Sequence, residues 1–174
     1  GMLADTSFLK RADELTFSTL IEVMKESGVS VEDVVDLISV ERSFSEKICR
    51  LKGMKRLDYY RVSGFLLAYT KVGSFESSVS SLLLKVGADI AFASSQRDER
   101  FLISGRAKKE MVELGLNLGE FFDDISEGFH GTGGGHRGAA VLKGRGDAEE
   151  ALEECVQKMH RLMNEEGWEK DLTE

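Results

Sequence analysis

The chain of 174 residues contains no proline and only two cysteines, Cys49 and Cys155. These cysteines lie far apart, without C-x-x-C spacing or paired histidines, so the sequence predicts neither a disulfide framework nor a zinc site. No apolar run approaches the roughly 20 residues of a membrane-spanning helix, and no secretory signal is apparent at the N-terminus. We therefore expect a cytoplasmic protein with no membrane partner.

Acidic residues outnumber basic ones, 31 against 23, so the formal net charge is −8. The acidity is uneven, however. From Gly146 onward there are ten acidic and three basic residues, so this segment carries −7 and the rest of the chain about −1. Apolar residues recur at helical spacing within the acidic segment, which favours a C-terminal helix with a solvated acidic face. A local basic site elsewhere in the chain remains open.

The hydrophobic pattern changes near residue 61. Residues 12–55 are predicted to form two or three helices, with Ser30 and Asp33 as a helix cap, whereas the later segments alternate between strand and helix patterns. Ser74 is the expected cap of the first helix in this second part. The expected strands are 62–73, two within 88–107 joined by a polar turn at 96–99, and one within 137–144; the expected helices lie near 75–86, 108–116, 118–125 and 148–163.

These patterns predict an α/β protein of the α+β type. Its mixed β-sheet of about four or five strands would be flanked by helices and preceded by a helical connector. We place the connector at residues 1–60 and the sheet domain at residues 61–174. No internal repeat is visible.

The run "GTGGGHRGAAVLKGRG", residues 131–146, holds seven glycines. Successive glycines can turn backbone N–H groups into a concave nest for an anion, and His136 and Arg137 would add donors suited to phosphate. A flexible loop with an exposed histidine is an equally good interpretation from spacing alone. The run matches neither a P-loop nor a G-x-G-x-x-G turn.

Two stretches resemble a known family. "GGGHRGAA" at Gly133–Ala140 is similar to the GGGH signature of the DHH-associated domain, the C-terminal substrate-binding half of DHH phosphoesterases, including RecJ-like exonucleases and oligoribonucleases. "FLISGRA" at Phe101–Ala107 is similar to the family strand that ends in Ser-x-Arg. The resemblance implies contacts to substrate phosphate or base from Ser104, Arg106, Gly133, Gly134, Gly135, His136 and Arg137. The signature departs from the family after His136, because Gly138–Val141 replaces Asn-Ala-Ala-Gly.

A weaker match lies upstream. "ADTSFLKRAD" at Ala4–Asp13 resembles the Asp-Thr-Gly-x-Phe segment near the end of the catalytic DHH domain, with Ser7 replacing glycine. The resemblance implies that Asp5 is a ligand of a manganese pair and that residues 1–60 include the end of that domain; a simple helix cap is the alternative. The chain contains no Asp-His-His triplet. We therefore expect Mn²⁺ in the full family enzyme, but no catalysis or bound metal in this chain alone.

Two functions follow from the resemblance. In the first, the chain is the substrate-binding part of a manganese-dependent DHH-type phosphoesterase acting on nucleotides or short single-stranded oligonucleotides, with a catalytic DHH domain supplied in cis or in trans. In the second, it is a stand-alone nucleotide- or nucleic-acid-binding module. A structural or dimerising domain is a third possibility, and a homodimer is left open.

Overall fold

The computed structural model describes residues 5–6, 9, 12–38 and 42–168. The chain forms two compact units, Gly1–Arg42 and Ser43–Glu174. The helix of residues 44–55 packs onto the sheet unit through Cys49 and Gly53. The division into a connector at residues 1–60 and a domain at residues 61–174 stays a prediction. Within the described ranges, no helix is both long and apolar enough to cross a membrane.

Two helices with conventional caps lie among the described residues of the first unit. Helix α2 (Glu14–Ser27) begins after Asp13, whose side chain accepts the N–H of Thr16 at 2.8 Å. Helix α3 (Val31–Ile38) begins at the predicted cap. There the Ser30 hydroxyl accepts the N–H of Asp33 at 3.1 Å, and the Asp33 carboxylate accepts the N–H of Ser30 at 2.9 Å. This reciprocal pairing confirms the predicted capping box.

The second unit is built on a mixed sheet, which confirms the predicted fold class. The described residues form six strands in the order β1-β2-β3-β4-β6-β5, and only the β2–β3 pair is parallel. The strands are β1 (Asp58–Val62), β2 (Phe65–Lys71), β3 (Ile90–Arg97), β4 (Arg100–Ala107), β5 (Thr132–His136) and β6 (Ala139–Arg145). The count exceeds the expected four or five, because β1 lies partly in the expected connector and β5 in the glycine run.

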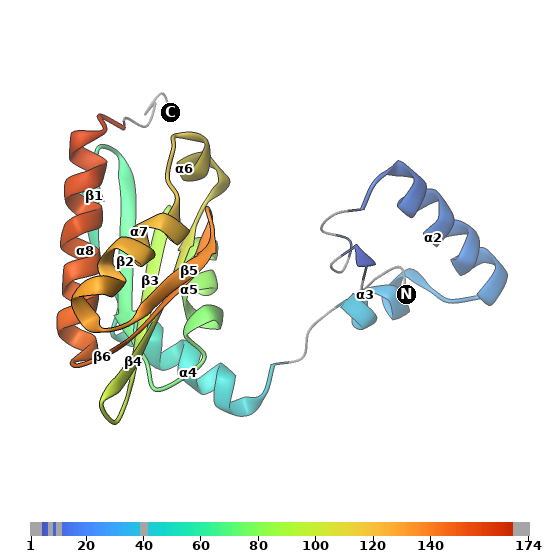
Figure 1. The fold of residues 1–174 in the computed structure, drawn as a ribbon. Coiled ribbons are helices and arrows are strands. Elements are labelled where there is room, and N and C mark those ends of the chain that lie inside the picture. Colours follow the sequence, from blue (N-terminus) through green and yellow to red (C-terminus); the bar gives the residue numbers. More distant parts are fainter. Residues whose placement is uncertain (1–4, 7–8, 10–11, 39–41, 169–174) are drawn as a thin grey trace. The chain divides into compact units, whose positions relative to one another are not determined.

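Helices cover both faces of this sheet (Figure 1). Helices α7 and α8 contact one face, and α4 and α5 contact the other. The helices of this unit are α4 (Phe44–Lys55), α5 (Glu76–Lys85), α6 (Lys109–Glu113), α7 (Leu118–Ser126) and α8 (Ala148–Glu165), with a short 3₁₀ turn at Glu127–Phe129. We refer to the two sides as the α8 face and the α5 face.

The two faces carry side chains of different size. On the α8 face, large side chains such as Phe65, Phe92 and Phe122 are fully buried in the main core. On the α5 face, the buried strand residues include Ala91 and Ala93, which let α4 and α5 lie close to the sheet. Strand alternation therefore separates the side chains of successive residues into two distinct layers.

Helix α5 begins differently from the prediction. The residue that precedes it is Phe75, at φ 58°, and Phe75 supplies no side-chain cap. Ser74 was the expected cap, but its carbonyl oxygen instead accepts the Cys49 S–H at 2.8 Å. Ser74 is thereby tied to α4 through its backbone, one residue too early to cap the helix.

Candidate functional site

The glycine run is a strand and not the loop that we predicted. Residues 132–136 form β5, which pairs with β6 across a tight turn at Arg137 and Gly138. Within β5, only Gly135 has a positive φ in the region that favours glycine, at 146°. An extended strand paired along one side does not form the concave nest of N–H groups that successive left-handed residues would provide.

Close backbone packing explains two of the glycines. A Cβ atom on Gly133 would lie 2.1 Å from the backbone carbon of Phe122, so α7 rests directly on the strand. A Cβ atom on Gly135 would lie 2.4 Å from the carbonyl oxygen of Ala139. Both glycines therefore belong to the α8 face of the sheet. Their predicted contacts to substrate stay a prediction.

Gly134 faces the opposite way, toward the α5 face. Alternation along the strand places it there, and a Cβ atom at this position would meet nothing within 4 Å. Its cross-strand partner is Val141, which in turn pairs with Ser104 on β4. Residues in such a row point to the same face. Gly134 thus leaves an open space on the side of the sheet that also carries the other predicted residues.

The neighbouring row holds the two chemically strongest candidates. Arg106 pairs with Ala139, and Ala139 pairs with His136. With strands about 4.8 Å apart, the Cα atoms of Arg106 and His136 are about 10 Å apart across the small side chain of Ala139. His136 is exposed and Arg106 is half-buried. The structure therefore places the predicted arginine and histidine in one row on the α5 face, on either side of Ala139. We call this row, together with the neighbouring row of Ser104, Val141 and Gly134, the phosphate face.

The Arg106 side chain includes a buried hydrogen-bond donor, its Nε atom, for which no acceptor lies among the described residues. A buried donor without a partner costs on the order of 1–3 kcal/mol, whereas a guanidinium binds phosphate oxygens readily. An anion on the phosphate face would therefore be attracted to a group that is already partly desolvated.

Ser104 is placed beneath a helix. It is 1% exposed, and its hydroxyl lies 3.2 Å from the Ser77 hydroxyl and 3.1 Å from the Ser80 hydroxyl, both on α5. These contacts fasten α5 to β4 beside Arg106. A direct contact of Ser104 with substrate stays a prediction. Its observed contacts hold β4 against α5.

Among the described residues, some basic side chains near the phosphate face form ion pairs with carboxylates and others do not. Lys108 and Lys109, which follow Arg106, are paired with Asp89 at 2.8 Å and Glu113 at 2.7 Å. By contrast, in the part of the chain that the structure describes, no ion pair is found for Arg106, His136, Arg137 or Lys143. Strand alternation places Lys143 on the α5 face. Arg137 lies exposed in the β5–β6 turn, at the end of this face. The phosphate face thus carries uncompensated positive charge within an acidic chain.

Sequence reasoning missed the residues of β6 that lie between the predicted residues of β4 and β5. Ala139 and Val141 lie between the predicted residues because β6 is inserted between β4 and β5. The predicted strand over 137–144 was the available signal, because alternate residues of a strand share a face. What the sequence did not supply was the order of the strands.

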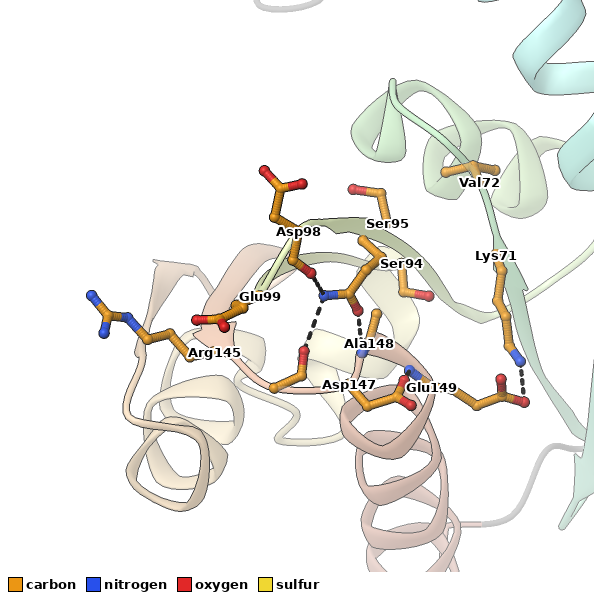
Figure 2. Close-up of a pocket in the computed structure, with 12 residues that line it drawn as sticks. Lys71, Val72, Ser94, Ser95, Asp98, Glu99, Arg145, Asp147, Ala148 and Glu149 are labelled. Atoms are coloured by element: carbon orange, nitrogen blue, oxygen red, sulfur yellow. Dashed lines mark hydrogen bonds and ion pairs between the residues drawn. The ribbon is translucent and has the colours of Figure 1, made fainter.

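A cavity of about 680 Å³ lies elsewhere, at the start of α8 (Figure 2). Its lining carries four carboxylates but only two cationic side chains: Asp98, Glu99, Asp147, Glu149, Lys71 and Arg145. The first two N–H groups of α8 already donate to side chains, those of Gln96 and Asp147. Excess negative charge and occupied donors make this cavity a poor site for phosphate.

The described residues assemble no group of three or more histidine, cysteine, aspartate or glutamate side chains that could hold a metal ion. Asp5, the residue predicted to be a manganese ligand, is exposed. Two-metal phosphoester hydrolysis requires several such ligands around ions roughly 3.5–4 Å apart. The described part of the chain therefore does not fit a manganese pair, and the role of Asp5 stays a prediction.

Comparison with known proteins finds relatives in sequence and in fold. The chain is 27% identical over 164 residues to an uncharacterized protein of Methanocaldococcus jannaschii, covering 93% of this chain and 49% of that one. The fold is similar to an exopolyphosphatase-related protein from Bacteroides fragilis, with a TM-score of 0.62, 14% identity and coverage of 94% and 49%. It is also similar to the C-Ala domain of Aquifex aeolicus alanyl-tRNA synthetase, with a TM-score of 0.50, 20% identity and coverage of 61% and 97%.

The chain thus spans about half the length of its curated relative. The model of the DHHA1 domain matches residues 66–165, which include all of β2 but its first residue, β3 to β6 and the whole of α8. This range contains both rows of the phosphate face and the glycine strand. The chain therefore belongs to the DHHA1 family, as a DHH-associated module.

Proposed function

We propose that this chain is the substrate-binding part of a phosphoesterase that acts on nucleotides or short single-stranded oligonucleotides. The observation that carries the proposal is the row Arg106–Ala139–His136 on an open sheet face beside Gly134. Arg106 and His136 lie on either side of Ala139, whose side chain is small, and Gly134 beside them has no side chain. This arrangement suits a phosphate group that must approach the backbone closely.

Each residue has a distinct task in this proposal. Arg106 offers a planar guanidinium to two phosphate oxygens, and His136 donates from the other side of Ala139. Gly134 and Ala139 leave room for the sugar or for a bridging oxygen. Held at two points, a phosphoester would be oriented for attack, which is the entropic part of catalysis.

The attacking group must come from elsewhere in this proposal. The described residues do not assemble a metal site, so we assign the chemical step to a catalytic DHH domain, in cis or in trans. In that domain Mn²⁺ would generate the hydroxide nucleophile, and Asp5 is the residue of this chain proposed to reach it.

Helix α2 of the first unit carries exposed apolar side chains that could contact the catalytic domain. All residues of α2 are described and none is buried, and Leu15, Phe17 and Ile21 are 73%, 49% and 51% exposed. Apolar side chains gathered on one helix usually mark an interaction surface. We propose that the catalytic domain covers this surface.

Calorimetric titration with adenosine 3′,5′-bisphosphate and with a 5′-phosphorylated dinucleotide tests the binding role. We expect Arg106→Ala and His136→Ala each to weaken binding by about 10-fold or more, because a charge-assisted hydrogen bond contributes roughly 1.5–3 kcal/mol. Arg100→Ala is the matched control, since Arg100 lies on the same strand and face but six residues away. Equal losses in Arg100→Ala and Arg106→Ala would contradict the proposed site.

A stand-alone binding module is the second candidate, and the similarity in fold to the C-Ala domain is the observation that favours it. The two candidates differ in their need for a catalytic domain. Adding a separately produced catalytic DHH domain together with Mn²⁺ should give phosphoester hydrolysis under the first. Tight binding without hydrolysis in this mixture would favour the second.

A further inference from the structure

The two edge strands of the sheet, β5 and β1, differ in how far other parts of the chain cover them. Strand β5 ends one side of the sheet and lies against α7, whose backbone approaches Gly133 closely. Strand β1 ends the other side, and four of its five residues are exposed. Tyr59 and Tyr60 are 62% and 45% exposed, which is unusual for neighbouring aromatic residues on a strand. An uncovered edge strand is a template for pairing with another strand.

The register identifies the backbone groups that this edge presents. Ser63 and Gly64, at φ 50° and 85°, form a two-residue turn, so the flanking pair Val62 and Phe65 exchanges hydrogen bonds. The pattern alternates, and Tyr60 with Leu67 is the next such pair. The N–H and C=O groups between them therefore point away from the sheet.

These outward groups belong to Tyr59 and Arg61. The opposite side of β2 confirms the alternation, because Leu66 N–H donates to the Asp89 carboxylate and the Asp89 N–H donates to the Leu66 carbonyl, both toward β3. The Tyr59 N–H donates locally to the Asp58 carboxylate at 2.8 Å, a bond that a pairing strand would replace. β1 can thus accept one more antiparallel strand.

We propose that β1 pairs with β1 of a second copy of this chain about a two-fold axis at Tyr60. This register places Tyr59 opposite the partner's Arg61 and uses both outward residues of each copy, giving four backbone hydrogen bonds. An axis at Arg61 would set two arginines directly opposite each other, which is unfavourable. An axis at Tyr59 would need the N–H of Leu57, which already donates to the Met54 carbonyl at 3.3 Å.

The side chains support the same register. Tyr60 stacks on Tyr69 with ring centres 5.9 Å apart and meets the edge of His160 at 5.5 Å. The partner's Tyr60 would lie directly opposite Tyr60, extending this aromatic row across the axis. A hollow of about 340 Å³ lined by Tyr60, Val156 and His160 lies beside the strand and can receive the incoming ring. Because the paired strands are short, the dimer should dissociate on dilution.

Sedimentation equilibrium of the full chain tests the dimer, with the 19.3 kDa monomer as reference. We expect a concentration-dependent mass approaching twice this value. Arg61→Pro should shift the equilibrium to monomer while preserving the circular dichroism spectrum, because this proline removes an outward N–H and no bond within the sheet. A wild-type chain that stays monomeric at all accessible concentrations would overturn the proposal.

Cross-linking tests the register independently of that variant. At Tyr60 the two copies form a non-hydrogen-bonded pair with Cα atoms about 4.5 Å apart, within the range of a disulfide. Tyr60→Cys, oxidised with copper phenanthroline, should give a covalent dimer, whereas Tyr59→Cys should not, since the two copies of residue 59 are offset along the strands. A dimer that resists Arg61→Pro, or that cross-links at residue 59 and not at residue 60, would show a different interface.

Discussion

The side chain of Gln96 accepts the first N–H of α8, that of Ala148, at 2.6 Å. Its amide nitrogen donates to the carbonyls of Asp98, Arg100 and Gly146 at 2.6, 3.2 and 3.0 Å. One glutamine therefore joins the β3–β4 turn, the end of β6 and the start of the last helix. Figure 2 shows this junction, with Ala148 and Asp147 at the start of α8.

Replacing this glutamine should lower stability measurably. We expect Gln96→Ala to reduce the free energy of unfolding by about 1–2 kcal/mol, because backbone groups at the start of α8 lose a partner. Urea denaturation followed by circular dichroism measures the change. Gln157→Ala is the control, because Gln157 makes one exposed contact with Glu153 on the same helix, and we expect a loss of at most about 0.5 kcal/mol.

Two neighbouring glycines should respond oppositely to alanine. Gly133→Ala forces a Cβ atom into the backbone of α7, so we expect a loss of at least about 3 kcal/mol or failure to fold. Gly134→Ala meets open space and should stabilise the strand by about 0.5 kcal/mol. Thermal unfolding of the two variants compares them. Similar melting temperatures would contradict the assignment of the two residues to opposite faces.

A larger side chain at Gly134 should separate binding from stability. Gly134→Val places a branched group on the phosphate face, beside the row of Arg106 and His136, without disturbing α7. We expect at least about a 10-fold loss in affinity for adenosine 3′,5′-bisphosphate, through steric exclusion, and an unchanged or higher melting temperature. Unaltered affinity would place the ligand elsewhere.

Salt should affect nucleotide binding only weakly. The phosphate face offers a few cations, so few counterions are released on binding. For a single-stranded oligonucleotide of about ten nucleotides, we expect the logarithm of the affinity to fall with the logarithm of salt concentration with a slope of about −1 to −2. Titrations at several salt concentrations give this slope. A value corresponding to six or more phosphates would indicate an extended nucleic-acid surface instead.

The Cys155 thiol should be protected from alkylation. Burial, with a smaller contribution from the Glu154 carboxylate, raises the pKa of this thiol well above its ordinary 9.0. The native chain should therefore react with iodoacetamide at Cys155 only through unfolding. Because the unfolded thiol ionises at lower pH than the folded one, this group should also reduce stability as pH rises above about 9. Mass spectrometry after timed labelling, with and without urea, measures the protection.

Local patterns predicted the helices and hairpin well. The reciprocal cap at Ser30 and Asp33 and the two strands within 88–107 depend on neighbouring residues, and both were found. Strand β1 was missed because its first four residues are all exposed, which removes the alternation that marks a half-buried strand. Strand β5 was missed because glycine has a low intrinsic preference for strands.

The candidate site was only partly predictable. Family resemblance selected Arg106 and His136, and the structure places both in one row. Sequence could not divide Gly133, Gly134 and Gly135 between two faces, because that division depends on the register with β6. Nor could it show that Ser104 lies under α5, a contact between residues 24 and 27 positions apart.

The contact between Gly133 and Phe122 changes how the glycine signature should be used. Two main chains meet there without any layer of side chains between them. A protein that had lost all affinity for phosphate would still need a residue without a side chain at this position in order to fold. Half of the signature is thus explained by the packing of the fold, and Gly134, His136 and Arg106 are the positions that we propose for ligand binding.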